Sequence, residues 1–164
     1  MTDALTEFRS SLEELGRDAQ LEKKGRRPLP PVDRPLLRRM LLSLGELLET
    51  DPGGDGDLSA QVSDDVANAR KWIARLGDRW ESTLIGEMQL ACTEHIQGVD
   101  PRYMSHPRFD FDYVVAARQR IEMRLSALEA LGQAVDEELL GRVAQADQRL
   151  AKVLRERCEE PDES

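Results

Sequence analysis

The chain has 164 residues, of which 40% are hydrophobic and 34% are charged, and its formal net charge is −9. This length fits one domain, and the composition is too apolar for a disordered chain and too charged for a membrane protein. Its 23 basic and 32 acidic side chains disfavour nucleic-acid binding, which draws much of its affinity from Lys and Arg at phosphates. We expect one folded domain over residues 1–164, with no membrane partner.

The longest uncharged apolar stretch runs from Met40 to Gly45, far short of the roughly 20 residues that a spanning helix needs. Charged side chains interrupt the first ten residues, where a signal peptide would need an apolar run. Cys92 and Cys158 stand alone, without the repeated spacing of a disulfide framework. These features predict a cytoplasmic protein with reduced thiols.

The first helix is expected from about residue 3 to residue 24, because apolar residues recur there at helical spacing. They are Leu5, Phe8, Leu12, Leu15 and Ala19. Two lysines and Gly25 follow, a pattern typical of a helix end. Residues 26–33 contain three prolines in four positions and predict a stiff linker.

A second helix is predicted to begin after Asp33, a good N-cap, and to end near Thr50. Its apolar stripe comprises Leu36, Leu37, Met40, Leu41, Leu42, Leu44, Leu47 and Leu48. Because this stripe is wider than one neighbouring layer covers, the helix is either central to the core or available for self-association. Residues 51–58 predict a flexible acidic loop rich in glycine.

Helical spacing resumes from Ser63 to Gln97, and the sequence leaves open whether Gly77 bends one helix or separates two. Residues 100–111 contain two prolines and predict a non-helical segment. A helix carrying Val114 to Leu131 should end near Gly132, and a last helix should run from Val135 to Arg157 before an acidic tail at 159–164.

No segment alternates as a strand does, so the fold class is all-α. We expect an antiparallel bundle of five or six helices, some of them long, with a C-terminal αα-hairpin at Gly132.

Metal and cofactor chemistry find little support. Neither histidine lies in the Glu-x-x-His motif of a di-metal bundle. Cys92 and His95 are three apart and would need His106 and Cys158 to complete a zinc set, but the outer pair lacks zinc-site spacing. We therefore expect core packing at Cys92, no metal and no cofactor. Nucleophile and phosphate-loop motifs are absent as well, so no catalytic residue is assigned.

The most distinctive stretch is RYMSHPRFDFDY at 102–113, which holds four of the seven aromatic residues. Its Arg102 and His106 are similar to the Arg and His motif of HEPN-type helical ribonucleases, with three intervening residues where that family has about four to six; the resemblance implies RNA cleavage at the 2′-hydroxyl. The stretch otherwise closes the bundle, with Phe109 and Phe111 inward, or presents a partner-binding set: Tyr103, His106, Arg108 and Phe109.

A basic patch is a second candidate contact surface, formed by Lys23, Lys24, Arg26, Arg27, Arg38 and Arg39. A solvated helix end and linker explain the same residues. Trp72 and Trp80, eight apart, are expected to be core residues or interface anchors.

These observations predict a non-enzymatic helical module for protein–protein interaction: an adaptor, a regulator or a small subunit of a larger complex, with a protein partner or a second copy as its ligand. The alternatives are a HEPN-like RNA-cleaving enzyme that uses Arg102 and His106, or a small helical subunit of a nucleoprotein complex.

Overall fold

The computed structural model describes residues 3–23, 31–50 and 56–159. Within these ranges 87% of residues are helical and none is in a strand, which confirms the all-α fold class. The helices are α1 (Asp3–Lys23), α2 (Arg34–Thr50), α3 (Gly56–Leu76), α4 (Asp78–Gly98), α5 (Pro101–Met104), α6 (Phe111–Ala130) and α7 (Glu137–Glu159). None of these helices is long and apolar enough to cross a bilayer.

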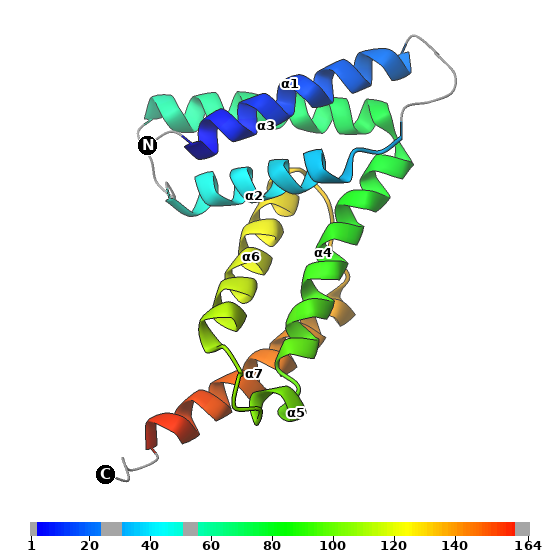
Figure 1. The fold of residues 1–164 in the computed structure, drawn as a ribbon. Helices are drawn as coiled ribbons and strands as arrows, with labels where there is room; N and C mark the ends of the chain where they lie inside the picture. Colours follow the sequence, from blue (N-terminus) through cyan, green and yellow to red (C-terminus); the bar gives the residue numbers. More distant parts are fainter. Residues whose placement is uncertain (1–2, 24–30, 51–55, 160–164) are drawn as a thin grey trace.

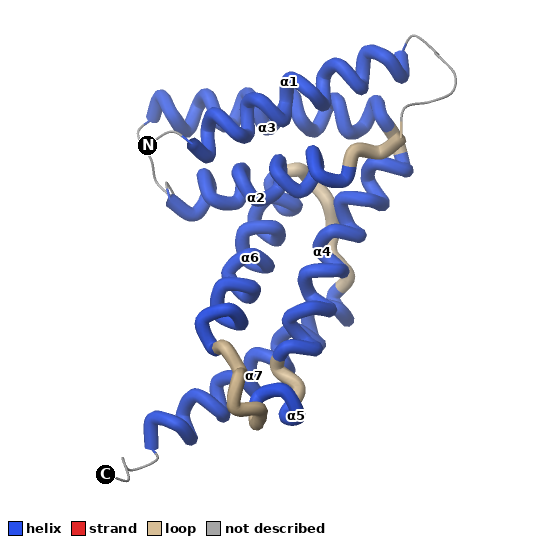
Figure 2. Tube along the Cα trace, viewed as in Figure 1, coloured by secondary structure: helices blue, strands red, loops and turns tan. Residues whose placement is uncertain are grey.

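The helices form two groups that cross steeply (Figure 1; Figure 2). Helices α1, α2 and α3 lie alongside one another in one layer, while α4 and α6 run away from that layer. Helix α7 packs mainly against α4 at the far end, where the short α5 also lies. The chain turns back after α6 through Gly132, but α7 crosses the other helices instead of pairing along the length of α6.

Four of the helices are preceded by an aspartate that caps the first turn. Its short carboxylate accepts a hydrogen bond from a backbone N–H that has no partner within the helix. The acceptors are Asp33 at α2, Asp100 at α5, Asp110 at α6 and Asp136 at α7, with N···O distances of 2.9–3.2 Å. The N-cap predicted at Asp33 is therefore confirmed.

Two glycines provide left-handed backbone at helix boundaries. Gly77 has φ +88° and separates α3 from α4, so the region that the sequence left ambiguous contains two helices. Gly132 has φ +75° and follows α6, where Gln133 N–H donates to Leu128 O and Gly132 N–H donates to Glu129 O. This pair of bonds is a Schellman motif, which satisfies carbonyls that the helix end would leave free.

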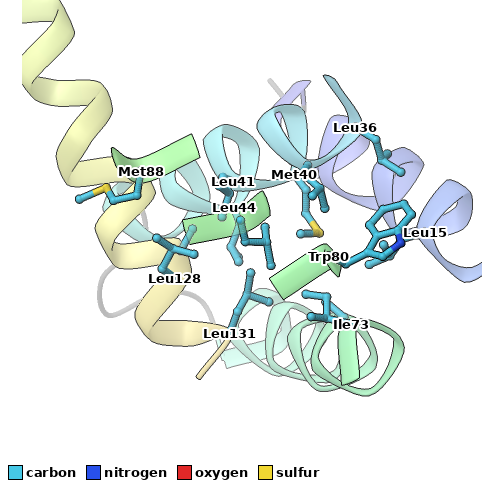
Figure 3. Close-up of a cluster of buried hydrophobic side chains, with 14 of the residues drawn as sticks. Leu15, Leu36, Met40, Leu41, Leu44, Ile73, Trp80, Met88, Leu128 and Leu131 are labelled. Atoms are coloured by element: carbon cyan, nitrogen blue, oxygen red, sulfur yellow. The ribbon is translucent and has the colours of Figure 1, made fainter. Parts of the chain in front are cut away.

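The central core lies between the two helix groups (Figure 3). Its fully buried side chains include Leu36, Leu37, Met40, Leu41 and Leu44 of α2 together with Trp80, Met88 and Leu128 from α4 and α6. Helix α2 packs against α1, α6 and α4, so it is central to the core. Five residues of the broad stripe are buried, whereas Leu42, Leu47 and Leu48 are partly exposed; self-association through this helix stays a prediction.

Gly45 marks a very close crossing of α2 and α6. A Cβ atom built at this glycine would lie 2.3 Å from the carbonyl oxygen of Met123 and 2.6 Å from its carbonyl carbon. Only a residue without a side chain permits this approach. The absence of a side chain at Gly45 therefore determines how closely α6 approaches α2.

The helices differ from the expected ones in two places. Helix α3 begins at Gly56, so residues 56–58 are helical where the acidic loop was expected, and Ser63 lies inside the helix instead of capping it. The segment at 100–111 contains the four-residue α5, since proline is well tolerated at a helix's first position. The predicted linker at 26–30, the loop at 51–55 and the tail at 160–164 lie outside the described residues.

The two tryptophans have separate roles. Trp80 is fully buried in the central core, whereas the half-buried Trp72 of α3 packs over Gly16 of α1, within 3.2 Å of where a Cβ would stand. They occupy different helices, so they do not form one continuous anchor face.

Candidate interaction surface around α5

A small apolar cluster holds α5 in place at the end of the molecule far from α1–α3. It consists of Val99 just before α5, Met104 of α5, Val114 of α6, and Ala146 and Leu150 of α7. Each of these side chains is buried. Helices from three parts of the chain therefore fix the backbone of α5 and the loop that follows it.

The four aromatic residues of the stretch 102–113 differ in how far they are exposed to solvent. Phe109 and Phe111 are half-buried against the small cluster and contact each other edge to face, with ring centroids 4.7 Å apart and planes at 88°. Tyr103 and Tyr113 are 60% and 62% exposed. The sequence offered two alternatives for this stretch, closing the bundle or facing a partner. In the structure the phenylalanines pack inward while the tyrosines face solvent.

A shallow hollow of about 310 Å³ opens between α5 and the start of α6. Its lining includes all four residues of the predicted partner-binding set: Tyr103, His106, Arg108 and Phe109. Gly98 of α4, the N-cap residue Asp110, and Tyr113 and Val114 of α6 complete it. We call Tyr103, His106, Arg108, Phe109 and Tyr113 the aromatic surface.

A backbone contact shapes the rim of this hollow. The Arg108 N–H donates to Nδ1 of His106 at 3.1 Å, so that nitrogen acts as an acceptor and the imidazole is held against the loop. Tyr113 belonged to the distinctive stretch and its aromatic character was a usable signal, whereas Gly98 comes from the preceding helix and carried no signal in the sequence.

A second hollow of about 530 Å³ lies on the other side of α5, against α7. Its walls are Pro101, Met104 and Ser105 on one side and Arg149, Lys152, Val153 and Glu156 on the other. Sequence reasoning missed this hollow, because nothing in α7 distinguishes these residues from any other solvated helix face.

Asp100 and Arg102 form a local pair at the start of α5. The Asp100 carboxylate accepts hydrogen bonds from the Arg102 backbone N–H at 2.9 Å and from its guanidinium at 3.3 Å. The Arg102 guanidinium and N–H lower the pKa of Asp100. Arg102 is itself 89% exposed, so its role in the structure is to secure this turn from the solvent side.

The predicted basic patch is only partly described. Arg38 pairs with the buried Glu87 at 3.0 Å, and Arg39 pairs with Glu14. Both described arginines are therefore matched by carboxylates. Lys24, Arg26 and Arg27 lie outside the described residues, as does the side chain of Lys23.

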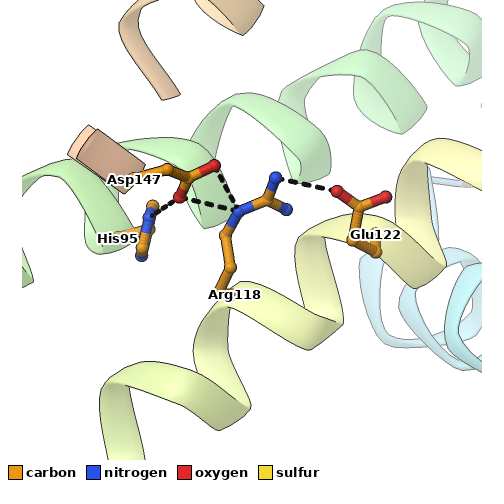
Figure 4. Close-up of polar contacts among 4 residues, drawn as sticks. All are labelled: His95, Arg118, Glu122 and Asp147. Carbon is orange, nitrogen blue, oxygen red and sulfur yellow. Dashed lines mark hydrogen bonds and ion pairs between the residues drawn. The ribbon is translucent and has the colours of Figure 1, made fainter. Parts of the chain in front are cut away.

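His95 takes part in a polar network at the junction of α4, α6 and α7 (Figure 4). Its buried Nε2 lies 2.9 Å from Asp147 Oδ1, and Asp147 also accepts from Arg118 Nε at 2.8 Å. Arg118 in turn pairs with Glu122 at 2.7 Å. The imidazole thus connects helices instead of facing an open site.

Cys92 lies one turn before His95 and is buried, and this burial raises the pKa of its thiol. Within the described ranges no group of three or more His, Cys, Asp or Glu side chains comes together as a metal site would require. His106 lies on the exposed loop after α5, and the side chain of Cys158 is not described.

Comparison with protein families, with curated proteins and with solved structures found no match to this chain.

Proposed function

We propose that this chain is a non-enzymatic interaction module that binds a protein partner through the aromatic surface. One observation carries the proposal: the two most exposed large aromatic side chains of the described chain, Tyr103 and Tyr113, line the same hollow. Tyrosine and arginine are the residue types on which interface binding energy most often concentrates.

The rigidity of the underlying segment supports this proposal. Asp100 and Asp110 cap α5 and α6, and the small cluster anchors the loop between them. A surface held in one conformation loses little conformational entropy when it binds. The backbone that carries Tyr103 and Tyr113 is therefore held in one conformation.

The lining indicates what the partner should offer. An apolar side chain fits beside Phe109 and the two tyrosine rings, and a neighbouring carboxylate can reach Arg108, which is exposed and has no ion pair among the described residues. A partner segment with one apolar anchor next to an acidic residue meets both requirements.

The RNA-cleaving alternative has less support. Arg102 is engaged by Asp100, and Nδ1 of His106 accepts from a backbone N–H. The nucleoprotein alternative rests on the basic patch, whose described arginines are paired with carboxylates.

Affinity capture from the native cell tests the proposal, with the tagged full chain as bait. The double variant Tyr103→Ala/Arg108→Ala should lose the captured protein, because it removes about 1–3 kcal/mol or more of contact energy per interface anchor. Its thermal stability should stay close to wild type, since both residues are exposed.

The matched control is Lys71→Ala/Arg75→Ala, which changes two exposed residues on α3. It should retain the partner. Equal capture by both double variants would contradict the proposal, as would purified protein that cleaves RNA and loses this activity in His106→Ala.

A further inference from the structure

A groove between α2, α4 and α6 lies apart from the aromatic surface and has a volume of about 350 Å³. Its lining contains three arginines, two glutamates and three apolar residues: Arg38, Arg120, Arg124, Glu87, Glu94, Leu42, Leu90 and Ala91. Its size falls in the lower part of the range typical of small-molecule sites. We call it the arginine groove.

Arg124 is the unusual member of this lining. It is only 8% exposed, yet it makes no salt bridge with any described residue. Its Nε has no hydrogen-bond partner, and its Nη1 donates only to the Arg120 carbonyl at 3.3 Å. Burial lowers the pKa of this guanidinium. A buried cation without a counter-ion is costly, and an anion in the groove would offset that cost.

The glutamates of the groove offset this charge only in part: Glu87 and Glu94 attract the Arg124 guanidinium electrostatically, but neither forms a salt bridge with it. Both Glu87 oxygens are engaged by Arg38, at 3.0 and 3.4 Å. Glu94 is exposed and forms no ion pair with Arg124. Three guanidinium groups against two carboxylates leave one positive charge in excess at the lining, and the Arg124 Nε–H has no acceptor.

The apolar residues of the arginine groove favour a ligand that carries a hydrocarbon group as well as a negative charge. Leu90 is 50% exposed, one of the few large apolar side chains of the described chain that faces solvent, and it lies in the same groove as the half-buried Leu42 and the buried Ala91. An anion with a short hydrocarbon tail would place its charge at Arg124 and cover Leu90. A simple inorganic anion would leave that leucine in water.

We propose that the arginine groove binds a small organic carboxylate, with the carboxylate hydrogen-bonded to Arg124 and Arg120 and a short apolar tail against Leu90 and Leu42. The inference does not depend on the function proposed for the aromatic surface, since the two share no lining residue.

A nuclear magnetic resonance titration with three probes tests this site in the full chain. Hexanoate should shift the Arg124 Nε–H signal and the Leu90 methyl signals saturably. Acetate should act at Arg124 alone and bind more weakly, and hexan-1-ol should not saturate either signal. Failure of hexanoate to saturate the Arg124 signal, or equal binding of hexan-1-ol, would overturn the proposal.

Arg124→Met keeps an unbranched apolar stem and removes the guanidinium, so hexanoate binding monitored at Leu90 should weaken roughly tenfold or more, the value of one charged hydrogen bond. Arg120→Gln changes an exposed residue and should weaken binding severalfold; it provides the same test if the first variant does not fold. Arg142→Gln on α7, outside the groove, should bind as wild type. Unchanged affinity in both groove variants would contradict the assignment.

Discussion

Replacing Gly45 with alanine perturbs the close crossing of α2 and α6. The added Cβ would meet the Met123 carbonyl oxygen at 2.3 Å, whereas ordinary contact begins near 3.4 Å. The opposing atoms include backbone, which cannot rotate away as a side-chain tip can. Helices α2 and α6 must therefore separate by about 1 Å, and the packing of Leu41 and Leu44 on one side and Leu128 on the other loosens with them.

Two opposing effects set the size of the change. Overpacking of a close-packed core costs about 1–3 kcal/mol, and more where backbone must shift. Alanine in a helix interior recovers up to about 1 kcal/mol relative to glycine. The net result should be a loss of about 2 kcal/mol or more from the free energy of unfolding, which for a chain of this size lowers Tm by about 4–8 °C.

Urea denaturation followed by circular dichroism measures this loss, and Gly141→Ala is the matched control. Gly141 also lies inside a helix, but a Cβ there meets nothing within 4 Å, so this variant should gain up to about 1 kcal/mol. If Gly45→Ala were as stable as wild type, or gained stability as the control does, the close crossing would be refuted.

Three further predictions concern the polar groups. Asp147→Ala should cost about 1–3 kcal/mol of unfolding free energy, because it leaves the buried His95 Nε2 and the Arg118 guanidinium without their shared acceptor; a loss below a few tenths in urea denaturation would contradict the network. In a Cys158→Ser variant, Cys92 should react with a thiol reagent only on unfolding, because it is buried and its thiol pKa is raised; rapid labelling of folded protein would contradict its burial. The pKa of Asp100 is lowered in the folded chain, so its contribution to stability is complete above the unfolded value of about 4 and is lost as pH falls through the lower folded value. The Arg102 amide resonance should therefore titrate at a lower pH than that of an ordinary aspartate, and it should lose this titration in Asp100→Asn.

Most of the helices could be predicted from sequence patterns that act within one or two helical turns. Helical spacing of apolar residues located α1, α2, α6 and α7 to within a few residues, and Asp33 and Gly132 marked real boundaries. These signals act within one turn or two, so they need no knowledge of the tertiary fold. The break at Gly77 was different, since a glycine permits a positive φ but does not require one.

Contacts between different helices were harder to predict from the sequence. The approach of Gly45 to Met123 joins residues on α2 and α6, and the buried Arg124 gives no hint in sequence that it will lack a carboxylate. The stretch 102–113 was recognised by its composition, and six of its residues line one hollow. The second hollow, which Arg149 and Lys152 line, depends on where α7 crosses, and no local pattern determines that crossing.

The proposed function requires the aromatic surface to contact a partner protein. Its most direct test replaces Tyr103 with a photo-crosslinking amino acid in the full chain, in the native cell, and compares it with the same replacement at Arg75 on α3. We predict one discrete covalent adduct to another protein from position 103 and none from position 75, with the adduct reduced by Arg108→Ala. No adduct from position 103, or the same adduct from both positions, would contradict the claim.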